Sequence, residues 1–217
     1  MATRSRRKMI LLIVLAALAT LLLSGQAGAV PNYAGNYRDP AYGVKANIST
    51  PSSMPSVTNG VVFNFVSNYD YGDWIQVGWV QGDGYCRALD GAYWPTVPTS
   101  YEESNCNGNY FEYQYSAQPL NFTRLYEVVY TGVAGEWRGI IAGTPRYGFA
   151  PYATPTLVEA LTELAGSTQP QTRASFTSVQ YKGQYSYFNF NQNYQQADNP
   201  PYATFYSYYN YTCYNGM

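Results

Sequence analysis

The 217-residue chain contains no histidine, and only 12% of its residues are charged. The absence of histidine excludes Ser-His-Asp and Cys-His nucleophile systems, histidine-ligated zinc and iron, and histidine pH switches. The 12 basic and 13 acidic residues give a net charge of −1, and so low and slightly negative a charge argues against a nucleic-acid surface, which needs clustered Lys and Arg. No calcium-loop pattern occurs, and we expect no metal and no cofactor. Aromatic residues, in contrast, make up 18% of the chain and include 25 tyrosines.

Long apolar runs are also scarce, and the one near the N-terminus is typical of an export signal. Four basic residues within positions 4–8 precede an apolar run over 9–23, and Ala27-Gly28-Ala29 matches a signal-peptidase site. A run of 15 residues is short for a membrane-spanning helix. We therefore expect a signal peptide over residues 1–29, secretion, and no membrane anchor on the mature chain. The pair Arg6-Arg7 leaves twin-arginine export as the less favoured route.

The chain has only three cysteines, all after the predicted cleavage site. In an oxidising compartment one disulfide is expected, and Cys86 and Cys106 are the nearest pair in the sequence. Cys213 would then remain free or pair between chains.

The remaining sequence is typical of an all-β protein. Runs of β-branched and aromatic residues alternate with Gly, Pro, Asn and Asp, which predicts an antiparallel β-sandwich of the jelly-roll, concanavalin-like type. We expect a loose lead-in over 30–43, rich in Pro, Gly and Asn, and a single domain over 44–217 that ends in a Tyr-rich stretch. Strands are expected near residues 44–49, 61–66, 73–80, 109–116, 123–131, 136–142, 174–181 and 184–190.

Alternation with a period of two is clearest over residues 73–80. Ile75, Val77 and Trp79 share one face of the predicted strand, and an aromatic residue, Gln76 and a glycine share the other. Such a polar second face suits the open side of a sandwich. The adjacent pair Glu102-Glu103, in contrast, lies in a turn-like stretch, and we interpret it as solvated.

The segment 156–165 fits either a helix or a strand. Its leucines recur at helical spacing, Thr156 and Glu159 match a capping box, and Gly166 stands where a glycine commonly follows a helix. As a strand, the same segment would place Glu159 and Glu163 on one face. Local propensity favours a short helix.

Two short motifs resemble those of a known family. The segment Ile75-Gln76-Val77-Gly78-Trp79 resembles a glutamine-bearing strand, and Glu159-Ala160-Leu161-Thr162-Glu163 resembles a glutamate-bearing strand, of secreted β-sandwich glutamic peptidases (the eqolisin and neprosin-like groups). Gln76 and Glu159 are 83 positions apart, which is similar to the separation in that family.

The resemblance implies hydrolysis of a polypeptide substrate at acid pH without histidine. Glu159 or Glu163 would act as general base on a water, and the Gln76 amide would help to position the water and stabilise the oxyanion. The aromatic residues that we expect to contact the substrate are Trp74, Trp79 and Tyr113.

Two other functions also fit the sequence. A non-catalytic module could bind an extracellular glycan through exposed Tyr and Trp rings. A structural cell-surface protein could instead associate with itself through the Tyr-rich C-terminal stretch over 181–217. The sequence leaves catalysis and binding open.

Overall fold

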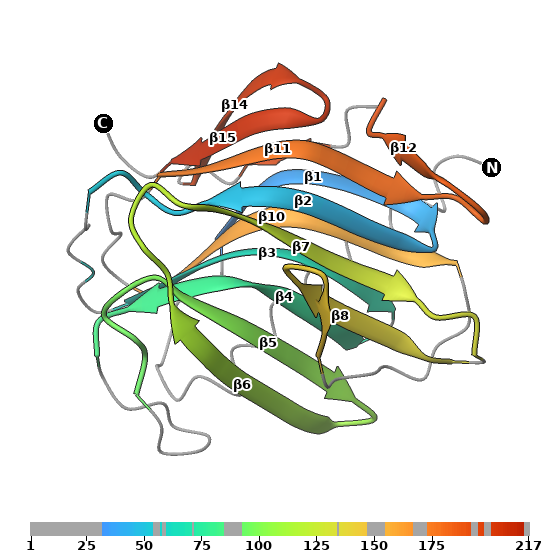
Figure 1. Cartoon of the computed structure of the whole chain (residues 1–217), viewed down its shortest axis with the longest axis horizontal. Coiled ribbons are helices and arrows are strands. Elements are labelled where there is room, and N and C mark those ends of the chain that lie inside the picture. Colours follow the sequence, from blue (N-terminus) through green and yellow to red (C-terminus); the bar gives the residue numbers. More distant parts are fainter. Residues whose placement is uncertain are drawn as a thin grey trace.

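The computed structural model confirms an all-β, antiparallel sandwich (Figure 1). It describes residues 32–53, 57, 60–70, 72–84, 93–133, 135–146, 155–166, 173–191, 195–197 and 201–214. These residues contain no helix, and therefore none that is long and apolar enough to cross a membrane. The predicted signal peptide lies outside them.

The first sheet has seven strands in the order β13-β1-β10-β3-β4-β5-β6. From one edge to the other, the strands are β13 (Gln195–Ala197), β1 (Asn32–Ala41), β10 (Thr156–Gly166), β3 (Gly60–Asp70), β4 (Asp73–Gly82), β5 (Thr99–Cys106) and β6 (Asn109–Ala117).

The second sheet has eight strands in the order β14-β15-β11-β2-β7-β8-β9, and β12 (Tyr187–Asn189) pairs with β11. Figure 1 places the C-terminal hairpin of β14 and β15 and the edge strand β6 at opposite ends of the sandwich. The strands are β14 (Tyr202–Ser207), β15 (Asn210–Tyr214), β11 (Arg173–Lys182), β2 (Gly43–Ser49), β7 (Thr123–Tyr130), β8 (Trp137–Ile141) and β9 (Thr144–Pro145).

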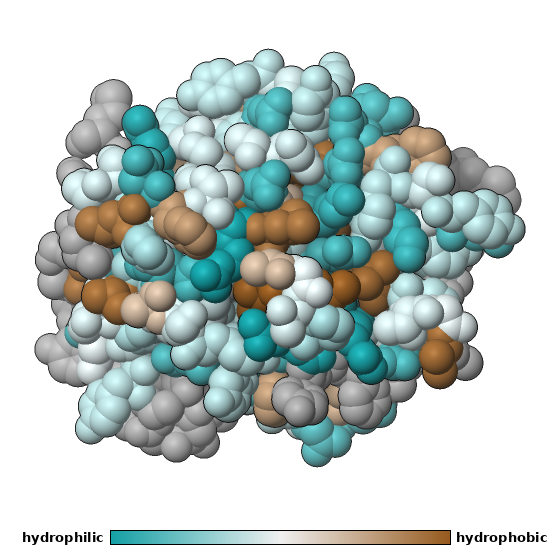
Figure 2. Space-filling model, in the orientation of Figure 1, coloured by the Kyte–Doolittle hydropathy of each residue, from teal (hydrophilic) through white to brown (hydrophobic). Residues whose placement is uncertain are grey.

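The main core lies between the two sheets and follows the predicted alternation. Ile75, Val77 and Trp79 of β4 are fully buried in this core, together with aliphatic residues of β2 and Phe176 of β11. The Trp79 indole N–H donates to the Ser49 carbonyl at 3.1 Å. The prediction that Trp79 contacts the substrate is therefore wrong, because its ring belongs to the core. On the face seen in Figure 2, hydrophobic residues form separate small groups among hydrophilic ones.

The segment predicted as a helix over 156–165 forms strand β10 instead. It pairs with β3 over residues 157–166 and along most of its length with β1, so Leu161 lies between Phe65 and Gly35. Two neighbouring strands satisfy its backbone hydrogen-bonding groups, and Val158 and Ala160 enter the core from one face. Tertiary pairing thus overrides the local helix propensity.

Other elements also differ from the sequence-based expectations. Residues 32–41, within the expected loose lead-in, form β1, and β5 had no predicted counterpart. Cys106 and Cys213 carry free thiols, so the structure lacks the expected Cys86–Cys106 disulfide; Cys86 lies outside the described residues. The Cys213 thiol is buried and donates to the Ala34 carbonyl at 3.4 Å.

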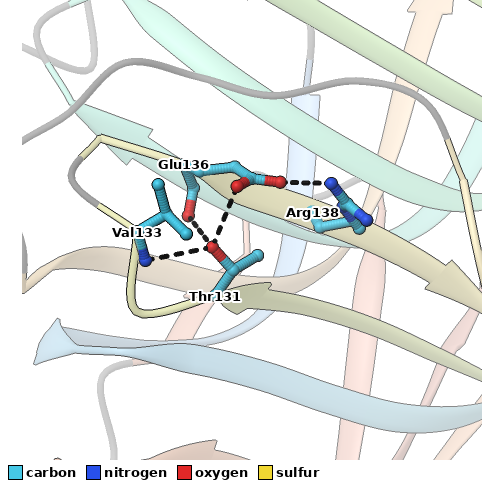
Figure 3. A network of polar contacts seen from close by, with 4 residues as sticks. All are labelled: Thr131, Val133, Glu136 and Arg138. Atoms are coloured by element: carbon cyan, nitrogen blue, oxygen red, sulfur yellow. Dashed lines mark hydrogen bonds and ion pairs between the residues drawn. The ribbon is translucent and has the colours of Figure 1, made fainter.

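A polar network closes the turn between β7 and β8 (Figure 3). The Thr131 hydroxyl accepts from the Val133 N–H at 3.3 Å and contacts both the carbonyl and the carboxylate of Glu136. Glu136 also forms an ion pair with Arg138. Exposed pairs of this kind contribute at most about 1 kcal/mol, so we interpret the network as a turn-closing device.

Candidate functional site

The first sheet carries a second set of side chains on its outer face, opposite the main core. On β4, Trp74, Gln76 and Gly78 alternate with the core residues and therefore take this face. Apolar residues gather on one part of the outer face, around Phe63, Phe65 and Leu161. Polar residues occupy the neighbouring part.

Five polar residues lie in register across five adjacent strands. We call them the polar row. Their side chains share the outer face, and directly opposed residues in antiparallel strands have Cβ atoms only about 5 Å apart. In strand order from β10 to β6, the members are Glu159, Ser67, Gln76, Glu103 and Glu112.

Hydrogen bonds join the members of the polar row in two groups. The Ser67 hydroxyl donates to Glu159 Oε2 at 2.9 Å. On the other side of β3, the Gln76 amide Nε2 donates to Glu103 Oε2 at 2.7 Å. The Tyr110 hydroxyl of β6 contacts the other oxygen of Glu103 and Glu112 Oε2, the latter at 2.9 Å. Gln76 and Glu159 thus flank Ser67, each held by a different partner.

Burial differs along the polar row. Ser67, Gln76 and Glu103 are 3%, 8% and 6% exposed, respectively, whereas Glu159 is partly exposed. Glu159 is thus less buried than these three residues, and the Ser67 hydrogen bond fixes its carboxylate.

Glu163 shares the outer face with Glu159 but stands apart from the polar row. It is opposite Phe63 on one side and Tyr33 on the other, and it is only 6% exposed. Of the two glutamates that the sequence proposed as general base, only Glu159 is aligned with Gln76.

Burial raises the pKa of several carboxyl groups on this face. Desolvation raises the pKa of Glu159 to about 7, against the opposing effect of the Ser67 hydrogen bond. Desolvation and the nearby charge of Glu159 raise the pKa of Glu163 to about 8. Burial, with Glu112 next in importance, raises the pKa of Glu103 well above its usual range. Clustered, poorly solvated carboxyl groups of this kind are typical of functional sites.

These pKa values predict that the protein is most stable at acid pH. A raised pKa in the folded state contributes stability that is present below the unfolded-state value of 4.5 and is lost as the pH rises through about 8. At about 1.4 kcal/mol per pKa unit, Glu163 alone contributes several kcal/mol, so the melting temperature should fall by roughly 10 °C between pH 5 and pH 9. Calorimetry of the wild type and Glu163→Gln measures this: the variant should show a clearly smaller fall. An equal fall in both proteins would contradict the assignment to Glu163.

Gly78, two residues after Gln76, has a steric reason to be glycine. A Cβ atom at this position would lie 2.0 Å from the Asn64 carbonyl oxygen and 2.7 Å from Phe65 Cα. Strands β3 and β4 therefore approach closely beside the polar row, which explains the glycine of the Gln-x-Gly motif.

Trp74 and Tyr113, two of the aromatic residues predicted to contact the substrate, lie on opposite faces of the first sheet. Trp74 lies on the outer face, where its ring contacts the Tyr110 ring edge at a centroid distance of 6.2 Å. Tyr113 is opposite Glu102 and so belongs to the other face of the sheet; it is 54% exposed. Trp74 is thus the predicted aromatic residue that lies near Gln76.

Sequence reasoning missed four residues of this site: Ser67, Glu103 and Glu112 of the polar row, and Tyr110 beside them. Glu103 was interpreted as solvated together with Glu102, but both glutamates are buried, on opposite faces of β5. Glu102 lies on the core side and accepts a hydrogen bond from Tyr115 at 2.7 Å. The alternation Tyr101-Glu102-Glu103-Ser104 was the available signal, because a strand there must send one glutamate to each face.

Within the described part of the chain, no group of three or more Cys, Asp or Glu residues is arranged to hold a metal ion. The side chains that form the site carry carboxyl, amide and hydroxyl groups, which can move protons and donate hydrogen bonds to a developing negative charge.

Comparison with known proteins reveals similarity at the level of structure. No protein-family model matches the sequence, and no curated protein is significantly similar to it. The fold is similar to that of scytalido-glutamic peptidase solved with a peptide-based transition-state analog (TM-score 0.57, 12% identity, covering 86% of this chain and 99% of that one). It is also similar to SCP-B, a member of the eqolisin family of peptidases, in complex with the tripeptide Ala-Ile-His (TM-score 0.55, with the same identity and coverage). At this identity the likeness shows a shared fold.

Proposed function

We propose that the protein hydrolyses peptide bonds, with Glu159 as general base and the Gln76 amide as hydrogen-bond donor to the oxyanion. The observation that carries this proposal is the alignment of Glu159, Ser67 and Gln76 in one register position on one face of the sheet. The similarity in fold to two glutamic peptidases supports it, as do the two sequence motifs.

The spacing of these residues suits the reaction. Strands β10 and β4 are separated by β3, so the backbones of Glu159 and Gln76 are about 10 Å apart. The small Ser67 lies between Glu159, whose carboxylate it holds, and Gln76, whose amide donates to Glu103; we place the water and the substrate carbonyl over Ser67. The Ser67 hydroxyl donates to one oxygen of Glu159, which leaves the other oxygen to accept a proton from the water.

The proposed reaction balances without a cofactor. The Glu159 carboxylate removes a proton from the water while the water oxygen attacks the carbonyl carbon of the peptide bond. The carbonyl oxygen becomes an oxyanion and accepts a hydrogen bond from the Gln76 amide. The protonated Glu159 then gives its proton to the amine nitrogen as the C–N bond breaks.

The pKa of Glu159 changes the expected pH dependence. A general base must be ionised, and the pKa of about 7 leaves Glu159 mostly protonated at acid pH. We therefore expect kcat/KM to rise roughly tenfold per pH unit below about pH 7 and to level off above it, rather than to peak in the acid range as the resemblance implied. The pH–rate profile of the purified protein measures this. A profile that peaks below pH 5 would contradict the assignment of Glu159 as an ionised base.

Cleavage itself is tested by incubating the purified protein with a denatured protein substrate between pH 3 and pH 9. The proposal predicts new peptide termini, identified by mass spectrometry, with the highest yield near neutral pH. Absence of cleavage at every pH would contradict the proposal.

A second candidate function is supported by the C-terminal hairpin. Tyr206 and Tyr208 are 74% and 43% exposed, so their rings are accessible for stacking on a sugar. If the protein cleaves no peptide, glycan binding by this hairpin becomes the leading function, tested by titration with soluble polysaccharides against a Tyr206→Ala variant.

A further inference from the structure

The geometry points to Glu103 as the residue that positions the Gln76 amide for the proposed reaction, with Tyr110 holding Glu103 in place. This inference rests on the proposed function, which assigns the chemistry to Glu159 and Gln76 alone. Glu103 touches neither the attacked carbonyl nor the water in that scheme. It acts through Gln76.

The contact between Gln76 and Glu103 fixes a flexible side chain. A glutamine side chain rotates about three bonds, and its amide can point in many directions when it is free. Here Nε2 donates to Glu103 at 2.7 Å, and both residues are less than one-tenth exposed. A primary amide has two N–H groups, so one remains for a ligand when Glu103 occupies the other. Glu103 thus holds the amide in one orientation while leaving it a donor for the reaction.

Glu103 is itself fixed from the side away from Gln76. The Tyr110 hydroxyl contacts its second oxygen and also lies 2.9 Å from Glu112 Oε2. The Tyr110 ring in turn packs against Trp74, which lies two residues before Gln76 on β4. These contacts thus link Gln76 through Glu103 and Tyr110 back to Trp74, which lies on the same strand as Gln76.

A purely structural role does not explain a carboxyl group at this position. The polar groups that affect the ionisation of Glu103 are Glu112, Glu163, Tyr110 and Gln76, and none of these four carries a positive charge. A buried carboxyl group without a cationic partner lowers stability when it ionises. Natural proteins retain locally unfavourable groups mainly at functional sites. The buried carboxyl group of Glu103 is therefore expected to serve function.

The kinetic test compares two substitutions at Glu103 with a matched control. Glu103→Leu removes the acceptor, and we expect kcat to fall by about 10–100-fold with little change in KM, because a displaced amide stabilises the transition state less. Glu103→Gln should retain most of the activity, because its amide oxygen still accepts a hydrogen bond from Gln76. Glu102→Leu replaces the neighbouring buried glutamate on the core side and should leave kcat within about twofold. Wild-type kcat in Glu103→Leu, or equal losses in Glu103→Leu and Glu102→Leu, would overturn the inference.

A second measurement does not depend on activity or on the folding of the leucine variant. In ¹⁵N NMR spectra, the side-chain amide signals of Gln76 should be well dispersed and should shift with pH as Glu103 titrates; the other acidic and phenolic groups that face Glu103 are Glu112, Glu163 and Tyr110. Glu103→Gln should abolish most of that shift. A shift that persists in Glu103→Gln would overturn the inference. A wild type that cleaves no peptide but shows the shift would contradict the proposed function while leaving the Glu103–Gln76 contact established.

Discussion

Glu159→Gln should lower kcat/KM for peptide cleavage by about 10²–10⁴-fold, which is the range that general acid–base catalysis contributes. Glutamine keeps the size of the side chain and can still accept the hydrogen bond from Ser67, which lies 2.9 Å from Glu159 Oε2. It cannot remove a proton from water. The variant should therefore fold and bind substrate normally, and steady-state kinetics at neutral pH measures the loss.

The control for this prediction is Glu102→Gln. Glu102 is also buried and also has a pKa raised to about 7 by desolvation, but it lies on the core side of β5. Its substitution should leave kcat/KM within about threefold of the wild type. If Glu159→Gln retains more than about a tenth of wild-type activity, Glu159 is not the general base.

Gln76→Ala should lower kcat by about 10²–10³-fold with a much smaller effect on KM. The amide is proposed to donate to an oxygen that carries negative charge only in the transition state, and removal of one such donor costs about 3–4 kcal/mol of transition-state stabilisation. An interaction of this kind changes kcat rather than substrate binding. Measurement of kcat and KM on one peptide substrate separates the two effects.

Gln114→Ala provides the matched control for Gln76→Ala. Gln114 also lies on the outer face, on the edge strand β6, where its amide contacts Glu112 at 3.3 Å. This amide lies away from the space between Glu159 and Gln76, and its loss should change kcat by less than about threefold. A drop in kcat as large as that of Gln76→Ala would indicate a general disturbance of the sheet.

The sequence was sufficient to predict the fold class and the two faces of β4. The alternation over residues 73–80 separates Gln76 from Ile75 and Val77 without knowledge of any neighbouring strand. The same alternation also placed Trp79 on the core face. Trp79 was nevertheless predicted to contact the substrate because it is aromatic, although the alternation already placed it on the core face. The structure shows that its ring is buried in the core.

The rest of the site depends on pairing between strands that are distant in the sequence. Glu159 and Ser67 are 92 positions apart, and only the register of β10 against β3 brings them into contact. The sequence left β10 open between a helix and a strand and favoured the helix, because its leucine spacing and capping residues are local, whereas its partners β1 and β3 are not. Glu103 was missed for the same reason: its contacts with Gln76 and Tyr110 follow from the pairing of β4, β5 and β6.

The central claim is that Glu159 and Gln76 act together on one peptide bond, and a double-mutant cycle tests it most directly. The measurement is kcat/KM on one peptide substrate at neutral pH for the wild type, Glu159→Gln, Gln76→Ala and the double variant. Residues that act as a unit lose little more together than the worse single variant loses alone, so the double variant should fall within about threefold of Glu159→Gln. Fully additive losses would show that the two residues act independently, and unchanged kcat/KM in both single variants would show that the reaction, if it occurs, does not use this pair.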